Sequence, residues 1–149
     1  MPEAMNLVNL RPLGQRTFFT TAEVARQLAI KPASAHVLCS RYVRQGLLVR
    51  LKRDHYALES HWTRLSTEER LRIANFLQVP SYVSFQTALA HHEVTTQVQR
   101  DYVESAALKR SRRLEIQGVA FCYHKLQPSL YFGFERRNGV FVATKEKAF

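Results

Sequence analysis

The sequence predicts an α+β fold in two parts, and two observations lead to this prediction. Within residues 20–58, apolar side chains recur at helical spacing up to Gly46. Two short runs follow, each apolar or alternating between apolar and polar residues. From residue 98 onward the apolar period changes towards two, and the runs are separated by glycine-containing turn dipeptides. We therefore expect a first domain at residues 1–62 and a small α+β domain with antiparallel hairpins at residues 63–149.

A helix-turn-helix is expected after Thr20. Glu23 stands three residues later, and this pair is typical of a capping box, in which each side chain satisfies a free backbone amide of the first helical turn. Only three residues, from Ala29 to Lys31, then remain for a turn. Pro32 suits the first position of a second helix because its φ is already helical, and Gly46 is the matching stop signal.

The second helix should have one buried and one exposed face, because its apolar residues recur at helical spacing. The buried set is Ala35, Leu38, Cys39 and Tyr42, and the exposed set is Ser34, His36, Val37, Ser40, Arg41 and Arg44. Residues 47–51 and 55–58 then predict two short strands, joined by a turn at Lys52, Arg53 and Asp54. A helix-turn-helix followed by a basic hairpin is a winged helix-turn-helix, in which the second helix is the recognition helix.

This order of elements predicts DNA binding, because a duplex presents phosphates on both sides of its major groove. We expect base edges to be read by hydrogen-bonding side chains of the recognition helix, namely Ser34, His36, Ser40 and Arg41. Phosphate contacts are expected from the cations Lys31, Arg44, Arg50, Lys52 and Arg53. Helix-turn-helix hairpins also serve as packing or protein-docking units, and surface arginines usually form only a solvated face, so a docking module stays open as an alternative.

The charge is spread over both domains. The 149 residues carry a formal charge of +10 and have a pI near 10.1. Residues 1–62 hold nine basic and four acidic groups, and residues 63–149 hold thirteen and eight, so each part is +5. This balance favours a polyanionic partner and allows a second basic surface in the second domain. Its candidate residues are Lys109, Arg110, Arg112 and Arg113, a run that is most often a solvated loop but that leaves RNA binding open.

No enzymatic motif is evident, and we expect neither a cofactor nor a metal. In the most tempting cluster, His91, His92 and Glu93, adjacent helical side chains point about 100° apart, so both histidines cannot face one metal without help. Cys39 and Cys122 lack metal-type spacing and lie in apolar patterns, so they are expected as buried free thiols in a reducing compartment. No run approaches the ~20 apolar residues of a membrane span, and no signal-peptide pattern is present, so the protein is expected in the cytoplasm, without a membrane partner.

The remaining elements follow from local signals. A helix is expected around Met5 to Leu13, and Phe18 and Phe19 are expected to pair with the wing as a short strand. Ser66 and Glu69 form a second capping box, opening a helix that must end before Pro80. The further predictions are a helix at Ser84–His92, strands at Val98–Ser105, Arg112–Ile116 and Val119–His124, and a hairpin of Leu130–Glu135 with Val140–Thr144. Their turns are Gln117-Gly118 and Asn138-Gly139.

Three runs in this order resemble the AbiEi family of AbiE-type toxin-antitoxin systems. They are SRYVRQGLLVRLKRDHYAL, which resembles the family's wing, PSYVSFQTALAHHEV, which resembles the helix opening its second domain, and YFGFERRNGVFVATKEKAF, which resembles its closing hairpin. The resemblance implies an autorepressing antitoxin whose winged helix binds inverted repeats in its own promoter. It also implies a second domain that neutralises a nucleotidyltransferase-like toxin without a stable complex.

The chain departs from that family at two points. Asp54 occupies the turn position where glycine is common, although Asp tolerates left-handed backbone better than most residues. The sequence ends at Phe149, where relatives continue into further helices. We therefore expect either a truncated chain or a short member of the family that acts only as a regulator.

Overall fold

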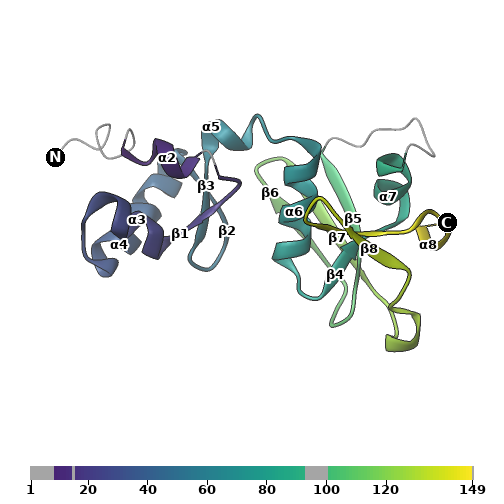
Figure 1. Ribbon diagram of the computed structural model, residues 1–149. Coiled ribbons are helices and arrows are strands. Elements are labelled where there is room, and N and C mark those ends of the chain that lie inside the picture. The colour runs from purple at the N-terminus through teal and green to yellow at the C-terminus, as the bar shows by residue number, and fades with distance from the viewer. Residues whose placement is uncertain (1–8, 15, 93–100, 149) are drawn as a thin grey trace. The chain divides into compact units, whose positions relative to one another are not determined.

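A computed structural model describes residues 9–14, 16–92 and 101–148 (Figure 1). The fold is mixed α+β, with one three-stranded and one six-stranded sheet. Contacts divide the chain into two compact units, Met1–Leu65 and Ser66–Phe149. The division falls three residues after the boundary expected from the sequence.

In the first unit, two helices precede the β-hairpin of a three-stranded sheet, after a short helix and the first strand, and one more short helix follows the hairpin. Its elements are α2 (Arg11–Gly14), β1 (Phe19–Thr20), α3 (Thr21–Leu28), α4 (Pro32–Arg44), β2 (Leu48–Lys52), β3 (His55–Leu58) and α5 (Glu59–Trp62). The sheet has the order β1-β3-β2 with antiparallel neighbours, and Phe19 pairs with Tyr56. The predicted pairing of Phe19 with the hairpin is therefore confirmed, whereas Phe18 lies outside the strand. Of the helix expected around Met5 to Leu13, residues 5–8 lie outside the described part, and α2 covers only its end.

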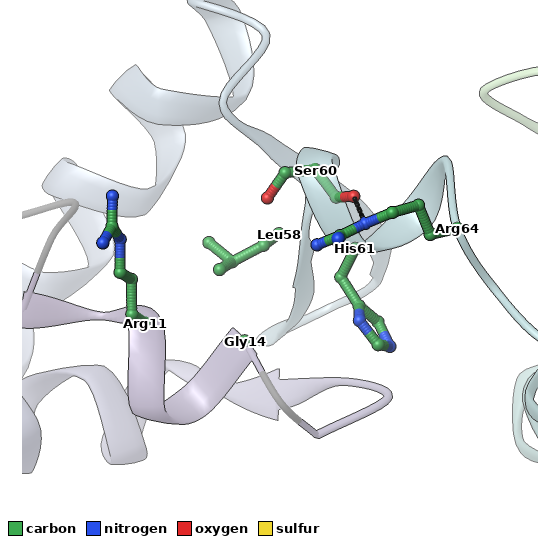
Figure 2. Close-up of a pocket in the computed structure, with 6 residues that line it drawn as sticks. All are labelled: Arg11, Gly14, Leu58, Ser60, His61 and Arg64. Carbon is green, nitrogen blue, oxygen red and sulfur yellow. Dashed lines mark hydrogen bonds between the residues drawn. The ribbon is translucent and has the colours of Figure 1, made fainter.

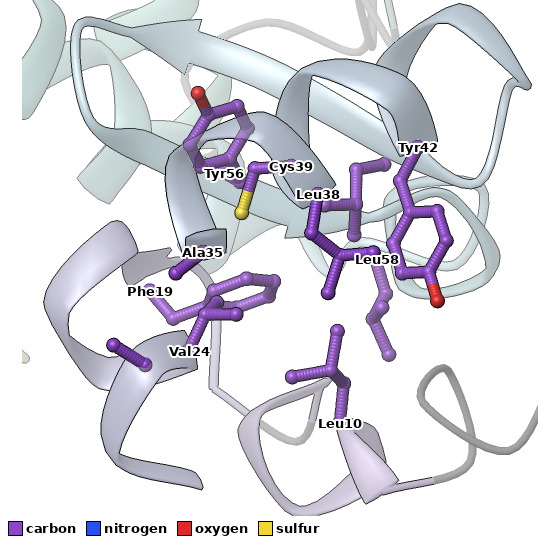
Figure 3. Close-up of a cluster of buried hydrophobic side chains, with 11 residues drawn as sticks. Leu10, Phe19, Val24, Ala35, Leu38, Cys39, Tyr42, Tyr56 and Leu58 are labelled. Atoms are coloured by element: carbon purple, nitrogen blue, oxygen red, sulfur yellow. The ribbon is translucent and has the colours of Figure 1, made fainter. Parts of the chain in front are cut away.

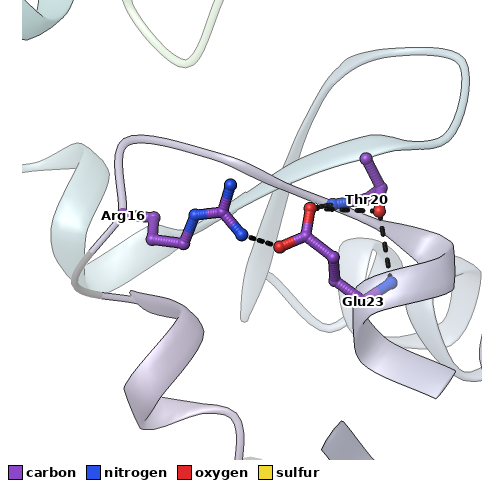
Figure 4. A network of polar contacts seen from close by, with 3 residues as sticks. All are labelled: Arg16, Thr20 and Glu23. Atoms are coloured by element: carbon purple, nitrogen blue, oxygen red, sulfur yellow. Dashed lines mark hydrogen bonds and ion pairs between the residues drawn. The ribbon is translucent and has the colours of Figure 1, made fainter. Parts of the chain in front are cut away.

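The capping box at Thr20 forms as predicted (Figure 4). The Glu23 N–H donates to Thr20 Oγ1 at 3.2 Å, and the Thr20 N–H donates to Glu23 Oε1 at 3.3 Å. Arg16 forms an ion pair with the second carboxylate oxygen of Glu23. α3 ends at Ala29, whose φ of 54° is left-handed, and α4 begins at Pro32. The predicted start and end signals of both helices are thus correct.

The core of the first unit joins α3, α4 and the three strands (Figure 3). The predicted buried face of α4 is confirmed, since its four members are at most 5% exposed. Leu10 precedes α2, and Phe19, Val24 and Leu58 come from β1, α3 and β3, so the buried face of α4 shares its core with these four other segments of the unit. Burial raises the pKa of the Cys39 thiol to about 11. The predicted free and buried state of both cysteines is also confirmed.

The second unit is built on the six-stranded sheet, with strand order β6-β7-β5-β4-β9-β8. Its elements are α6 (Thr67–Leu77), β4 (Ser81–Val83), α7 (Phe85–His91), β5 (Tyr102–Ala107), β6 (Arg112–Ile116), β7 (Val119–Lys125), the 3-10 helix η1 (Pro128–Leu130), β8 (Phe134–Arg137), β9 (Val140–Ala143) and α8 (Lys145–Ala148). The capping box of Ser66 and Glu69 forms, and α6 ends before Pro80 as predicted.

Both antiparallel hairpins expected from the sequence form, but the sheet that contains them is mixed. Among the described strands, β4 pairs with β9 and β5 pairs with β7 in parallel, and the other three pairs are antiparallel. β4 was not predicted because it has three residues, all buried, and so shows no alternation. The strand predicted from Leu130 is wrong in its first half, because Pro128 starts a 3-10 turn and Gly133 is left-handed with φ of 78°. β5 begins at Tyr102, and residues 98–100 of the predicted strand lie outside the described part.

Two hairpin turns and two tertiary hydrogen-bond systems hold the second unit together. Both turn dipeptides, Gln117-Gly118 and Asn138-Gly139, have positive φ at each residue, as the tightest hairpins require. The Tyr123 hydroxyl donates to the Ala74 carbonyl at 2.6 Å. The Asn75 side chain bonds both the N–H and the C=O of Phe141, at 2.6 and 3.2 Å. α6 is therefore tied to β7 and β9.

Replacing Thr20 by Ala should lower the free energy of unfolding of the first unit by about 1 kcal/mol, because the Glu23 amide loses its acceptor. Fluorescence of Trp62, the only tryptophan, reports on this unit during urea unfolding. Thr20→Ser keeps the hydroxyl and is the matched control. Equal unfolding midpoints for the Ala and Ser variants would contradict the role of the cap.

Alkaline pH should destabilise the first unit through Cys39. The folded state keeps the thiol proton as the pH rises from the ordinary pKa of 9.0 to about 11, whereas the unfolded chain releases it. The unfolded state therefore binds fewer protons, and the free energy of unfolding falls through this window by up to about 2–3 kcal/mol. Burial also raises the pKa of Tyr56, which acts in the same direction.

Urea unfolding at neutral pH and at the upper end of that window measures the loss. The Cys39→Ala variant should lose less stability between the two conditions than the parent does, since the tyrosines remain in both. An identical loss in parent and variant would show that the thiol does not contribute.

Candidate nucleic-acid interface

The four predicted base-reading residues lie on the solvent side of α4. Ser34, His36, Ser40 and Arg41 are all exposed, as are Val37 and Arg44. They form two neighbouring rows along the helix, because residues three and four apart stack on one face. One row holds Ser34, Val37 and Arg41, and the other holds His36, Ser40 and Arg44. The helix thus presents a continuous strip with hydroxyl, imidazole and guanidinium groups.

The N-terminal end of α4 is suited to a negatively charged ligand. Its first turn has no acidic residue, and its N-cap, Lys31, makes no side-chain hydrogen bond to the helix. Free amide groups and the helix dipole both favour an anion at such an end. Lys31 is exposed and adds a positive charge there.

The hairpin of β2 and β3 carries the other predicted phosphate-binding residues. Along β2 the side chains of Arg50 and Lys52 are exposed while Leu51 between them is buried. The strand begins and ends one residue later than predicted, so the turn consists of Arg53 and Asp54. Asp54 has φ of 64°, a conformation that Asp tolerates.

Two contacts bring the hairpin turn to the helices. The Asp54 carboxylate lies 3.8 Å from His36 Nδ1, and the Asp54 carbonyl accepts the Thr21 N–H at 3.1 Å. Both side chains of the pair are more than half exposed, so the contact adds little stability. The contact between His36 and Asp54 shows instead that the exposed strip of α4 and the hairpin turn are neighbours and form one surface. We call this the helix–hairpin surface: residues 31, 34, 36, 37, 40, 41, 44, 50, 52, 53 and 54.

The helix–hairpin surface is strongly positive. Residues 24–58 contain seven Lys or Arg and a single acid, Asp54. Sequence reasoning identified the cations but not the contact of Asp54 with His36, because these residues are far apart in sequence and no local pattern links them. His55 was also missed: its Nδ1 lies 2.8 Å from the Arg53 carbonyl, and its ring packs against Phe18. Its only sequence signal is its place directly after the turn.

The four residues proposed as a second basic surface lie on two different segments of the second unit. Lys109 and Arg110 are exposed between β5 and β6, whereas the other two arginines lie on β6. Arg112 donates to Gln78 Oε1 at 3.3 Å, and Arg113 donates to Glu115 Oε1 at 2.9 Å. Arg112 and Arg113 thus each bond a neighbouring side chain, although Arg113 is exposed like Lys109 and Arg110.

A cationic pocket of about 670 Å³ occurs elsewhere in the first unit (Figure 2). Arg11, His61 and Arg64 line it, and Arg64 is held by a hydrogen bond from its Nε to the Ser60 carbonyl at 3.2 Å. Its lining comes from α2 and α5 and from the end of β3 that is opposite the hairpin turn. Sequence reasoning missed it because these elements are separated along the chain. It is distinct from the helix–hairpin surface.

The histidines at the end of α7 make structural contacts. His92 Nδ1 accepts from Arg137 at 3.2 Å, and its Nε2 lies 2.7 Å from the Ala143 carbonyl. Burial, followed by the neighbouring His92 and Arg137, lowers the pKa of His91. Glu93 lies outside the described residues. Within the described ranges, no group of three or more His, Cys, Asp or Glu side chains is arranged to hold a metal.

No protein-family model matches the sequence, and no curated protein is similar to it. The resemblance to the AbiEi family therefore rests on the three quoted runs. Among the helices of the described residues, none combines the length and the apolar character needed to span a membrane.

Proposed function

We propose that the protein is a sequence-specific DNA-binding transcriptional regulator and that its first unit is a winged helix-turn-helix. The observation that supports this most directly is the 3.8 Å contact between His36 and Asp54, which joins the exposed strip of α4 to the hairpin turn. The element order α2-β1-α3-α4-β2-β3 and the sheet order β1-β3-β2 also agree with a helix-turn-helix extended by a wing. The proposal involves no catalysis, cofactor or metal.

In this proposal α4 enters the major groove, which is about 12 Å wide and accepts one helix. Arg41 can pair with guanine through two hydrogen bonds, and Ser34, His36 and Ser40 can donate to or accept from neighbouring base edges. Lys31 and Arg44 at the ends of the helix, and Arg50, Lys52 and Arg53 on the hairpin, then meet phosphates. Five such contacts would make log K fall by roughly 4–5 per log unit of salt.

The biological role we propose is that of an autorepressing antitoxin, as the resemblance to the AbiEi family implies. The first unit would bind inverted repeats in the promoter of its own operon. The second unit would counteract a nucleotidyltransferase-like toxin without forming a stable complex. A nucleotidyltransferase-like gene directly downstream of the gene, and loss of its toxicity on co-expression, would support this role. An isolated gene would count against it.

One observation favours a second candidate, a module that docks a protein partner through α4. Val37, at 60% exposure, is a large apolar residue in the middle of the helix–hairpin surface. In a DNA complex the same side chain can contact a thymine methyl group. Salt separates the two functions, because binding through several phosphates weakens steeply with salt, whereas a mainly apolar contact responds weakly.

Replacing Arg50, Lys52 and Arg53 together by Ala should weaken binding to all duplexes about equally and reduce the salt slope by roughly 3. The reason is that these hairpin cations are expected to contact phosphates and not bases. Fluorescence anisotropy with the promoter duplex and a scrambled duplex, over a range of salt concentrations, measures both effects. Arg64→Ala is the matched control, because this arginine lies in the pocket at the opposite end of β3. Unchanged promoter affinity in the triple variant would remove the hairpin from the interface.

Arg41→Ala should weaken binding to the cognate operator more than it weakens binding to scrambled DNA. A bidentate pair with guanine is worth roughly 1–3 kcal/mol of discrimination, and scrambled DNA does not form it in register. Titration of both duplexes at one salt concentration gives the ratio of the two losses. Equal losses would make Arg41 a phosphate contact and would assign base reading to Ser34 and His36.

A further inference from the structure

The second unit exposes a cluster of large apolar side chains on and around its last hairpin. Phe132 is 57% exposed, and Leu130, Phe134 and Phe141 are 48%, 36% and 40% exposed. Single apolar residues on a surface are ordinary, but a contiguous group usually marks a binding site. We call Tyr131, Phe132, Phe134 and Phe141 the aromatic surface.

Three rings of this surface, those of Tyr131, Phe134 and Phe141, are in contact and rest on a buried residue. The Phe134 ring lies 5.2 Å from that of Tyr131 and 6.2 Å from that of Phe141. Beneath them, the fully buried Tyr82 stacks on Phe134 with centroids 4.6 Å apart and planes 17° apart. These three rings are therefore the outer part of one aromatic group that continues into the core, and Phe132 lies next to Tyr131 in the chain.

The backbone that carries these rings is held by hydrogen bonds from three other residues. The donors are Lys147 of α8, Tyr82 of β4 and Thr144, which lies between β9 and α8. The carbonyls of Leu130, Phe132 and Gly133 accept from Lys147 Nζ at 2.8 Å, the Tyr82 hydroxyl at 3.3 Å and the Thr144 N–H at 2.8 Å. Gly133 is left-handed, and a Cβ there would lie 2.8 Å from Lys147 Cβ, so α8 packs directly on this segment. The exposed rings are thus presented in a fixed arrangement.

Cations lie over two of the rings. Lys147 Nζ is 4.0 Å from the centre of the Phe132 ring, and the guanidinium carbon of Arg136 is 5.8 Å from that of Phe141. Residues 131–148 contain four Lys or Arg and two Glu, so the surroundings are positive. A ligand that covers the rings would therefore also meet positive charge.

We infer that the aromatic surface binds single-stranded nucleic acid. Bases stack on the exposed faces of Phe132, Phe134 and Phe141, and the phosphates between them pair with Arg136 and Lys147. Aromatic rings interleaved with cations suit a flexible strand, whose base faces are accessible, and not a duplex, whose bases are already stacked. A purely apolar protein partner is a poorer match, because burying the two cations without an anion would be costly. This site is separate from the proposed duplex-binding surface of the first unit.

The test is binding of labelled oligo-U and oligo-dT of about 12 nucleotides to the full chain, measured by fluorescence anisotropy. Phe132→Ala and Phe141→Ala together should weaken binding about 100-fold, or about tenfold for each ring. Val79→Ala is the matched control, because Val79 is 61% exposed in the same unit but lies outside the aromatic surface. Arg136→Gln should flatten the salt slope by about 0.7.

Phe132→Leu and Phe141→Leu serve if the alanine variants do not fold, since leucine keeps apolar volume but removes the stacking face. A preference for oligo-U over oligo-dT would identify the 2′-hydroxyl as a contact, and binding of either strand supports the inference. Three results would overturn it: no saturable binding by the parent, equal affinity of parent and double variant, or light scattering that shows self-association through the rings. The double variant should still bind promoter duplex with the affinity of the parent. The variant with Arg50, Lys52 and Arg53 replaced by Ala should bind duplex more weakly and oligo-U as the parent does. Failure of one proposal is therefore distinguishable from failure of the other.

Discussion

The buried face of α4 is the constraint on which the rest of the first unit depends. Ala35, Leu38, Cys39 and Tyr42 pack against side chains from β1, α3 and β3 in the core. Each large apolar side chain contributes on the order of 1.5–3 kcal/mol when buried, so the helix cannot turn about its axis without losing several such contributions. A rotation by one residue, about 100°, would carry Arg41 into the core. Packing inside the unit therefore decides which side chains face outward.

Asp54 fixes the second part of the helix–hairpin surface by two means. Its left-handed backbone closes the turn between β2 and β3 in two residues, and its carbonyl accepts the first amide of α3. Its carboxylate also lies beside His36. The same group is the single acid on a surface that is otherwise positive, so it opposes phosphate approach while it positions the turn. A glycine at this position would close the turn equally well but would lose the contact with His36.

Local signals predicted most of the fold, and non-local pairing accounts for what was missed. The capping residues Thr20 and Ser66, the helix start at Pro32 and the Asn138-Gly139 turn act within a few residues of sequence, so they can be recognised without tertiary information. β4 pairs in parallel with β9 through Val83 and Val142, which no local pattern encodes. The residues of the candidate site were likewise predicted where the signal is local and missed where it is not. Helical periodicity identified the exposed strip of α4, whereas the contact between His36 and Asp54 and the pocket at Arg11 and Arg64 come from chain segments that only folding brings together.

The two units use positive charge in different surroundings, and this difference bears on which partner each one fits. In the first unit the cations flank Ser34, His36 and Ser40, whose polar groups match the edges of stacked bases. In the second unit Arg136 and Lys147 lie over aromatic rings, which match the faces of bases that are not stacked. Net charge is positive in both units and cannot separate these chemistries, and both would respond to salt. The neutral neighbours of the cations are therefore the informative residues: removing a hydroxyl or an imidazole changes base reading without changing charge, and removing a ring changes stacking without changing charge.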